Sequence, residues 1–383
     1  MKNLTTSIPH YTDLAIGGMD LDSLPFVAKR QIQDSISEFM NANFKFEELI
    51  HRRTSGSTGT MLDVYWSQED MLASLAPLWR QRSQLGVSVK DRHCSFHSSL
   101  VGNTVSYPDF IEDERELSFN RLFFDENRLT RYYEALRDFG PVWFDASPTS
   151  LYLFAKFIQR KGLEAPPTLR YIELSGEMAH KEHVDFIEST FRSTVRLQYG
   201  SREANAIAFQ CSYGQLHLLD NVYLELRDAD DTGIGDLAVT VLANRAMAFA
   251  RYEIGDRGRL LEGRHCECQS SATIVELSGA RKTDYFEFQG RLHYSSIFLE
   301  AVEAVNRIYL GAIMQFQVLF DGSKFFVRIS TGQTLVPQNV VASTFVETLA
   351  VIGLSNASFD FDFVDSLPVS QTGKFRYFIS SVI

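Results

Sequence analysis

Short apolar runs alternate with amphipathic segments through the first half of the chain. Apolar stretches at 141–144, 169–174 and 195–199 predict buried strands, and the segments between them, 150–160 and 180–191, have apolar positions at helical spacing. Strands that alternate with helices predict an α/β domain with a mainly parallel sheet. Ligands bind such sheets at the carboxyl ends of the strands, which here are followed by polar residues.

The pattern changes on either side of this region. Residues 28–41 and 68–86 have apolar positions near helical spacing and predict helices. From about 218 to 261, short β-prone runs are separated by turn residues such as those at 230–233. The sequence therefore predicts a β-rich subdomain that follows the parallel sheet in the same large domain.

The tail has its own pattern of about ninety residues. Helices are predicted at 295–307 and 337–352, strands at 312–320 and 324–329 around an Asp-Gly turn, and a half-buried strand where Phe alternates with Asp at 359–363. The order α-β-β-α-β is enough for an independent core. We therefore predict an N-terminal domain at 1–284 and a small α+β C-terminal domain at 285–383.

Composition narrows the class of protein. The chain has 383 residues, of which 45% are hydrophobic, and a formal net charge of −11, which argues against general affinity for nucleic acid or an anionic membrane. No apolar run reaches the roughly 18 residues that span a bilayer, and the first residues lack the apolar core of a signal peptide. Four cysteines do not make a disulfide scaffold. We expect a cytoplasmic monomer or homodimer.

A loop of small residues is the first candidate site. Thr54, Ser55, Gly56, Ser57, Thr58, Gly59 and Thr60 provide five hydroxyls and two glycines. Glycines permit close approach of the backbone, and hydroxyl and amide groups donate to phosphate oxygens. The loop is not a Walker A motif, because no Gly-Lys-Ser/Thr follows the second glycine. On composition alone, a run of Ser, Thr and Gly is more often a linker.

Four further motifs follow this loop in order. They are Tyr199-Gly200-Ser201-Arg202-Glu203, the stretch 251–256 ending in Gly255-Asp256, the stretch 279–284, and Gln371-Thr372-Gly373-Lys374. The series resembles the adenylate-forming superfamily of acyl-CoA ligases, peptide-synthetase adenylation domains and luciferases. The stretch from Ser175 to Cys211 is most similar to its phenylacetate-CoA ligase and capsule-locus (CapK-like) branch.

This resemblance implies a reaction and a set of cofactors. A carboxylic acid, aromatic or small and hydroxylated, would attack ATP in the presence of Mg2+ to give an acyl-adenylate and pyrophosphate. The acyl group would then pass to a thiol, most simply coenzyme A. Transfer to an amine, a carrier-protein thiol or a partner protein is the alternative, and a non-catalytic nucleotide-binding relative is a second one.

The resemblance also assigns roles to residues. Loop 54–60 would hold the β- and γ-phosphates, Glu203 would bind Mg2+, Asp256 would accept hydrogen bonds from the ribose, Lys374 would neutralise charge at the α-phosphate, and Asp284 would be the hinge. The remaining nucleotide-binding residues would be Ser175, Gly176 and Glu177 at the adenine, Tyr199 stacked on the base, and Gly200, Ser201 and Arg202. Taken singly, Glu203 could be a solvated acid, Asp256 a turn residue and Lys374 a surface lysine.

A second candidate site contains three cysteines and a histidine. Cys211 and His217 lie upstream of Cys266 and Cys268, and three thiols with one imidazole make a tetrahedral ligand set for structural zinc. The branch named above has a similar pattern. The alternative is three buried cysteines and an ordinary histidine. The remaining cysteine, Cys94, has no matching partner, and we expect it in the core.

Two regions bear on the acyl substrate and its acceptor. His93, His97 and Tyr107 are candidates for polar contact with the acid. Residues 289–294 correspond to a loop that in relatives lines the path of the acceptor, and they depart from the usual pattern. Arg291 and His293 in this stretch could contact an anionic acceptor or be solvated.

Overall fold

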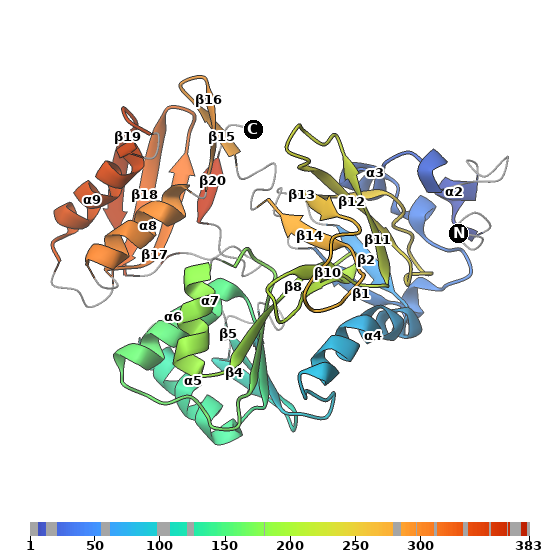
Figure 1. The fold of residues 1–383 in the computed structure, drawn as a ribbon, viewed down its shortest axis with the longest axis horizontal. Helices are drawn as coiled ribbons and strands as arrows, with labels where there is room; N and C mark the ends of the chain where they lie inside the picture. The colour runs from blue at the N-terminus through green and yellow to red at the C-terminus, as the bar shows by residue number, and fades with distance from the viewer. Residues whose placement is uncertain are drawn as a thin grey trace. The chain divides into compact units, whose positions relative to one another are not determined.

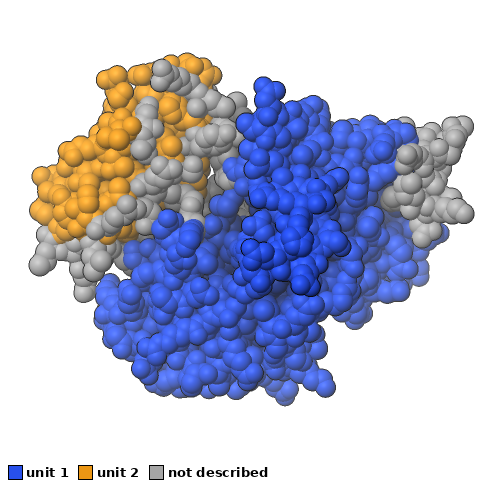
Figure 2. Space-filling view, viewed as in Figure 1, with its two compact units in different colours: residues 1–97, 108–120, 129–278 blue, residues 98–107, 121–128, 279–383 orange. Residues whose placement is uncertain are grey.

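The structure is a computed structural model that describes most of the chain. The described residues are 7–12, 21–54, 62–97, 108–120, 126–179, 181–278, 285–295, 297–309, 312–331, 336–351, 354–365, 367 and 377–380. They form two compact units, coloured blue and orange in Figure 2, which are described separately. Among these residues no helix is long and apolar enough to cross a membrane.

The first unit is built on one mixed sheet of twelve strands. In spatial order the sheet runs β11-β12-β13-β14-β10-β9-β8-β7-β6-β3-β5-β4 (Figure 1). Its parallel part consists of β5 (Glu116–Asn120), β3 (His93–His97), β6 (Trp143–Ala146), β7 (Tyr171–Ser175) and β8 (Thr194–Ser201). The predicted α/β class is confirmed, and the β-rich region joins the parallel strands in the same continuous sheet.

The antiparallel part of the sheet contains the strands that follow β8, together with β4 at the far edge. These strands are β4 (Phe110–Glu112), β9 (Asn205–Gln210), β10 (Leu216–Leu218), β11 (Val222–Arg227), β12 (Gly235–Val241), β13 (Tyr252–Leu261) and β14 (Ile274–Leu277). Because β9 reverses direction directly after β8, the turn between them lies at the carboxyl end of the last parallel strand. This is the position at which open α/β sheets bind ligands.

Helices cover both faces of the parallel strands. On one face lie α5 (Glu126–Phe139), α6 (Pro148–Arg160) and α7 (Lys181–Phe191), and on the other lies α4 (Gln68–Gln84). Phe144 of β6 packs on Phe191 of α7, whereas its neighbour Trp143 points to the opposite face and meets Trp79 of α4. This alternation is the period of two that buries both faces of a strand.

The helix boundaries follow local chemistry. Ser67 caps α4 by accepting a hydrogen bond from the N–H of Asp70 at 3.1 Å, and Ser147 caps α6 with Pro148 in the first turn. The helix predicted at 28–41 is wrong in its second half: α3 (Lys29–Asp34) ends at Ser35, and a 3-10 turn, η3 (Ile36–Phe39), follows.

The remaining elements of the first unit lie near its N-terminus. They are α2 (Pro9–Thr12), the 3-10 turns η2 (Leu21–Ser23) and η4 (Phe46–Glu48), and a hairpin of β1 (Ile50–Arg53) and β2 (Asp63–Trp66). Trp66 and Val64 of this hairpin are fully buried in one cluster with Phe249, from the segment between β12 and β13, and Tyr252 of β13. The hairpin therefore shares its core with the antiparallel part of the sheet.

The second unit has the predicted order of elements with two additions. Its sheet runs β19-β18-β17-β20, from β17 (Ile313–Phe320), β18 (Lys324–Thr331), β19 (Ser358–Phe363) and β20 (Phe378–Ser380), and its helices are α8 (Ile297–Ile308) and α9 (Gln338–Val351). The additions are β20 and a hairpin of β15 (Tyr285–Phe288) and β16 (Arg291–Tyr294). Phenylalanines dominate its core, including Phe298, Phe325 and Phe345.

Candidate functional site

The motifs that contain Tyr199 and Asp256 were both predicted to bind the nucleotide, and the structure brings these two residues together. The hydroxyl of Tyr199 on β8 donates a hydrogen bond of 2.9 Å to the carboxylate of Asp256 on β13. The ladder between β12 and β13 is irregular between Asp236 and Ala238, opposite the stretch that contains Asp256, and Gly255 has a φ of +82°. A bulge of this kind re-aims a side chain from its regular direction. It places the Asp256 carboxylate at the aromatic ring of Tyr199.

Glu203 is tied to the same strand. It lies in the turn between β8 and β9, is 6% exposed, and accepts a hydrogen bond of 2.9 Å from the hydroxyl of Tyr252. A carboxylate has about four lone-pair sites, so this one bond leaves room for a metal ligand. Glu203 is buried rather than solvated, which removes the simplest structural alternative to a binding role.

Gly200 is required by the turn that presents Glu203. A Cβ placed on Gly200 would lie 2.1 Å from the carbonyl oxygen of Asn205, closer than any side chain tolerates. The β8–β9 ladder also shifts register between Tyr199 and Gly200. Inside the turn, the Ser201 hydroxyl accepts a hydrogen bond of 3.2 Å from the N–H of Ala204, and the side chain of Arg202 is exposed. The backbones of the two strands thus approach each other directly beneath Glu203.

Thr54 closes the base of the hydroxyl loop. Its N–H donates to the carbonyl of Leu62 at 2.9 Å, and its Oγ1 accepts from the N–H of Leu62 at 2.8 Å. The same Oγ1 accepts from Lys29 Nζ at 3.0 Å. A hydroxyl oxygen has two lone pairs and one proton, so only its O–H remains to donate to a phosphate. Ser55, Gly56, Ser57, Thr58, Gly59 and Thr60 lie outside the described residues.

Ser175, Gly176 and Glu177 follow β7, as predicted. The Ser175 hydroxyl donates to Asp145 Oδ1 at 3.4 Å, and Glu177 Oε2 accepts a bond of 3.4 Å from the N–H of Thr149. Gly176 has a φ of +82°, which favours glycine. The carboxylate of Glu177 is therefore turned to the start of α6, and the backbone of the segment remains for a ligand.

Several of the residues predicted from the sequence fall outside the described part of the chain. These are Asp284, Lys374 and the rest of the 371–374 motif, and Tyr107; of His97 the strand position is described and the side chain is not. His93 is described: its ring stacks on Trp143 at 4.7 Å between centroids, and its Nε2 lies 3.9 Å from Glu116. Burial lowers the pKa of His93, so it stays neutral at physiological pH.

Sequence analysis missed a charged cluster on the face of the sheet under α4. Arg82 of α4 makes two hydrogen bonds, of 2.9 and 2.6 Å, to Glu173 of β7, and Tyr171 donates a third of 3.0 Å. Burial, followed by the charge of Glu173, raises the pKa of the neighbouring Asp145 to about 6. The signal was present in the sequence as acids within apolar strands, a placement that proteins keep only with a partner.

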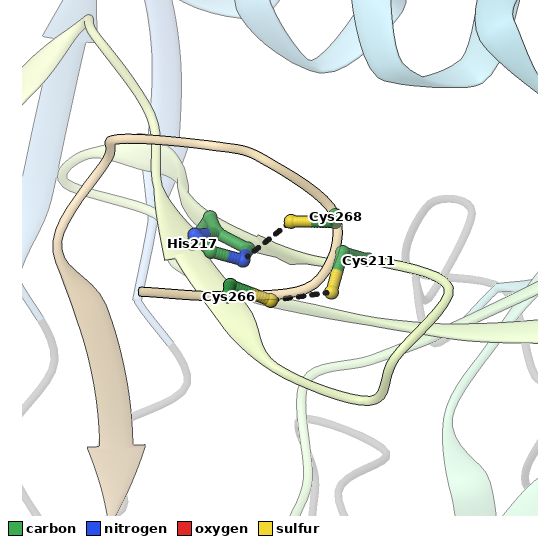
Figure 3. Close-up of side chains that lie close together, drawn as sticks. All are labelled: Cys211, His217, Cys266 and Cys268. Carbon is green, nitrogen blue, oxygen red and sulfur yellow. Dashed lines mark hydrogen bonds between the residues drawn. The ribbon is translucent and has the colours of Figure 1, made fainter. Parts of the chain in front are cut away.

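The predicted metal ligands lie together in the first unit. Figure 3 shows the side chains of Cys211, His217, Cys266 and Cys268 pointing toward one another, and their donor atoms all lie within 4.8 Å of one another. Cys211 follows β9, His217 lies on β10, and the other two belong to the loop between β13 and β14. Cys94 is fully buried in β3 and has no part in this group.

The geometry of this Cys/His cluster fits tetrahedral zinc. The sulfurs of Cys211 and Cys266 are 3.8 Å apart, and a tetrahedron with Zn–S bonds of about 2.3 Å has edges of about 3.8 Å. Cys268 Sγ lies 3.2 Å from His217 Nε2, while His217 Nδ1 lies 3.2 Å from the carbonyl of Ala272. A ring whose Nδ1–H donates to a carbonyl presents Nε2 to a metal. A hydrogen bond from the backbone of Cys268 lowers the pKa of Cys266 to about 7, which favours the thiolate.

The predicted acceptor loop at 289–294 is instead part of a hairpin. Gln289 and Gly290 form its two-residue turn with φ of 52° and 72°, as type I′ turns require, and 291–294 form β16. The ring of His293 stacks on Phe286 at 5.4 Å between centroids. His293 therefore packs on an aromatic neighbour, and the side chain of Arg291 is outside what the structure describes.

Comparisons with known proteins agree with this fold. No protein-family model matches the chain. A curated relative, Protein CapK of Staphylococcus aureus, is 23% identical over 374 residues, which cover 95% of this chain and 81% of that protein. A crystal structure of 2-hydroxyisobutyryl-CoA ligase in the postadenylation state, in complex with R3-HIB-AMP, has a TM-score of 0.74 at 14% identity and covers 100% of this chain and 87% of its own.

A second solved structure has a different acid in its name. A benzoate CoA ligase from Burkholderia xenovorans LB400 has a TM-score of 0.58 at 16% identity, over 88% of this chain and 69% of its own. The chain therefore has the fold of the adenylate-forming enzymes, as its motifs predicted. The likeness to solved structures is one of fold, and the acid, the acceptor and the residues of the site are matters for the proposal below.

Proposed function

We propose that this protein activates a carboxylic acid with ATP. The carboxylate attacks the α-phosphorus, pyrophosphate leaves, and the acyl-adenylate then passes its acyl group to a thiol, most simply coenzyme A. Asp256 receives the ribose hydroxyls, Tyr199 faces the base, and Glu203 would hold Mg2+, which would supply positive charge at the phosphates. In-line attack at phosphorus requires positioning and charge neutralisation more than proton transfer. These residues would supply the positioning, and the cation held by Glu203 would supply the neutralisation.

One observation carries this proposal. The hydrogen bonds Tyr199–Asp256 and Tyr252–Glu203 join β8 and the turn that follows it to β13, so that the two carboxylates belong to one frame. Both carboxylates lie next to irregular β-ladders, where side chains are re-aimed at functional sites. Acids held in this way suit a polar ligand with a bound cation.

Two residues of the proposal lie outside the described part of the chain. We assign Lys374 to the α-phosphate and the attacking carboxylate, where its ammonium would neutralise the charge that develops during transfer. We assign Asp284 to the hinge between the half-reactions. Both roles rest on the resemblance of the motifs that contain them, and the hydroxyl loop keeps its assignment to the β- and γ-phosphates on the same basis.

We also propose a structural zinc at Cys211, His217, Cys266 and Cys268. Four protein ligands leave no open position, so the ion would stabilise the fold and take no part in the reaction. It would link the end of β9 and strand β10 to the β13–β14 loop. The β13–β14 loop, which contains Cys266 and Cys268, follows the strand that carries Asp256, so the ion would also restrain that strand.

An exchange assay tests the proposed function. The full chain is incubated with ATP, Mg2+ and labelled pyrophosphate over a panel of aromatic and small hydroxylated acids, and label in ATP is measured. We expect exchange with at least one acid and none without an acid. An acid that supports exchange is then offered CoA, hydroxylamine and candidate carrier proteins, which separates the thiol acceptor from the amine. A folded protein that exchanges with no acid would be a non-catalytic binder.

A further inference from the structure

Cationic side chains gather where β1 ends, beside the hydroxyl loop. Arg52 and Thr54 are two residues apart in an extended segment, so they point to the same face of the hairpin. On that face the ammonium of Lys29 reaches Thr54 Oγ1 at 3.0 Å. Arg202, in the turn between β8 and β9, is close enough for its charge to lower the pKa of Arg52, after the larger effect of burial.

The positive charges of the two arginines, Arg52 and Arg202, are not balanced by acids that the structure describes. Among the described residues, neither Arg52 nor Arg202 forms an ion pair, and the hydrogen-bond partner of Arg52 is the neutral amide of Asn205, at 3.3 Å. Burying one cation beside another costs free energy unless an anion is present. The most economical reason for the arrangement is a ligand that brings the negative charge.

The partner of Arg52 is itself held firmly. Asn205 Nδ2 donates a hydrogen bond of 2.6 Å to the hydroxyl of Ser74, and that hydroxyl donates to the carbonyl of Met71 at 2.8 Å. These bonds leave Oδ1 of Asn205 directed at Arg52, and the left-handed φ of Asn205, 57°, belongs to the same turn as Glu203. The guanidinium is therefore oriented before any ligand binds, which is the condition for strong anion recognition.

We propose that Arg52 and Arg202, supported by Lys29, form a subsite for the pyrophosphate end of the nucleotide. A guanidinium offers two parallel N–H donors that match phosphate oxygens, and two arginines suit a polyanion better than a single phosphate. The subsite lies next to Glu203, the proposed metal ligand, whereas Tyr199 and Asp256 serve the nucleoside. It deepens the proposed function, because ATP is the source of the polyphosphate. It assigns the leaving group to Arg52, which no motif marked, together with Arg202 of the motif that ends at Glu203.

Calorimetric titration of the full chain tests this subsite. The ligands are inorganic pyrophosphate, ATP and AMP, each with Mg2+, and the variants are Arg52→Gln, Arg202→Ser and Arg52→Lys. We expect Arg52→Gln and Arg202→Ser each to lower the affinity for pyrophosphate and for ATP about tenfold, which corresponds to the loss of one charge-assisted hydrogen bond. The affinity for AMP should fall less than twofold. Arg52→Lys keeps the charge but loses the two parallel N–H donors, so its affinities should lie between those of the wild type and those of Arg52→Gln. Arg80→Gln removes an exposed arginine that pairs with Asp220, and it changes none of the affinities.

The outcomes separate this subsite from the proposed function. Equal losses for ATP and AMP, or no loss in either variant, would overturn the subsite even in an active enzyme. A wild-type chain that binds no pyrophosphate would overturn it as well. Binding of pyrophosphate that depends on both arginines, without exchange for any acid, would support the subsite and contradict the proposed function. Arg202 is exposed, so Arg202→Ser keeps the test decisive if Arg52→Gln does not fold.

Discussion

The hydroxyl of Tyr199 lies 2.9 Å from Oδ2 of Asp256, although 57 positions separate the two residues in the chain. Each was singled out by its own short motif, and nothing in either motif predicts the bond. The bond holds the carboxylate, which we assign to the ribose hydroxyls, from one side. Tyr199 is 9% exposed, so most of its side chain is enclosed by the protein.

This relationship predicts unequal effects of two substitutions on nucleotide affinity. Asp256→Asn removes the charged acceptor and should weaken ATP and AMP by about tenfold or more, because hydrogen bonds to a charged group are worth roughly 1.5–3 kcal/mol. Tyr199→Phe keeps the ring and loses only the orienting bond, so a loss of about two- to fivefold is expected. Calorimetric titration of AMP measures both, and a larger loss for Tyr199→Phe would contradict the assignment of Asp256 to the ribose.

Much of the fold was predictable because its helices and strands follow local periodicity. The segments around β6, α6, β7, α7 and β8 were placed within two residues of their observed bounds, since each has a clear apolar pattern and a Ser, Pro or Gly at its end. The stretch 28–41 was predicted wrongly in its second half. Its apolar positions fit a helix, but tertiary packing of Phe39 and Met40 against the core sets a 3-10 turn there. The hairpin at β15–β16 was missed because Gln289-Gly290 is not among the strongest turn signals.

Gly200 supplies a prediction about stability. A methyl group at this position would lie 2.1 Å from the carbonyl of Asn205, so Gly200→Ala should lower the free energy of unfolding by about 3 kcal/mol or more. Gly162→Ala is the matched control: its φ is 62° and a Cβ would have no neighbour within 4 Å, so a cost of about 1 kcal/mol is expected. Chemical denaturation measures both. Equal costs would show that the β8–β9 turn is not as tight as described.

The zinc proposal predicts linked losses of metal and stability. Cys266→Ser should reduce bound zinc from about one equivalent to less than a tenth and lower the free energy of unfolding by about 3 kcal/mol. Elemental analysis and thermal unfolding measure the two quantities. Cys94→Ala, which changes a buried cysteine outside the cluster, should destabilise the chain while zinc remains. Wild-type protein that carries no zinc after purification without chelators would contradict the proposal.

Asp145 gives a prediction with a defined pH dependence. Its pKa is raised from 3.8 to about 6 in the folded chain, so the folded state binds more protons than the unfolded state between those values. The contribution of Asp145 to stability therefore falls as the pH rises through about 4 to 6. Asp145→Asn should raise the free energy of unfolding at pH 7 by about 1–2 kcal/mol, and the gain should vanish near pH 4. A gain that persists at pH 4 would assign the effect to packing.

The candidate site was less predictable than the fold. Glu203, Asp256 and the four candidate metal ligands could be proposed from the sequence because they belong to short motifs or because cysteines are rare in the chain. Arg52 and Asn205 carried no such signal, since a strand arginine and an amide after a turn are common on solvated surfaces. Their contact depends on the pairing of β1 with β2 and on the turn after β8, which are long-range features of the fold.

The fate of a labelled carboxylate oxygen tests the central claim most directly. The full chain is incubated with ATP, Mg2+, hydroxylamine and CoA, and a pool of carboxylic acids whose carboxylates contain heavy oxygen, and the mass of the nucleotide product is measured. If the carboxylate attacks the α-phosphorus and the acyl carbon is attacked next, AMP leaves with one heavy oxygen. Unlabelled AMP, ADP with inorganic phosphate, or no nucleotide product from any acid would contradict adenylate formation by this protein.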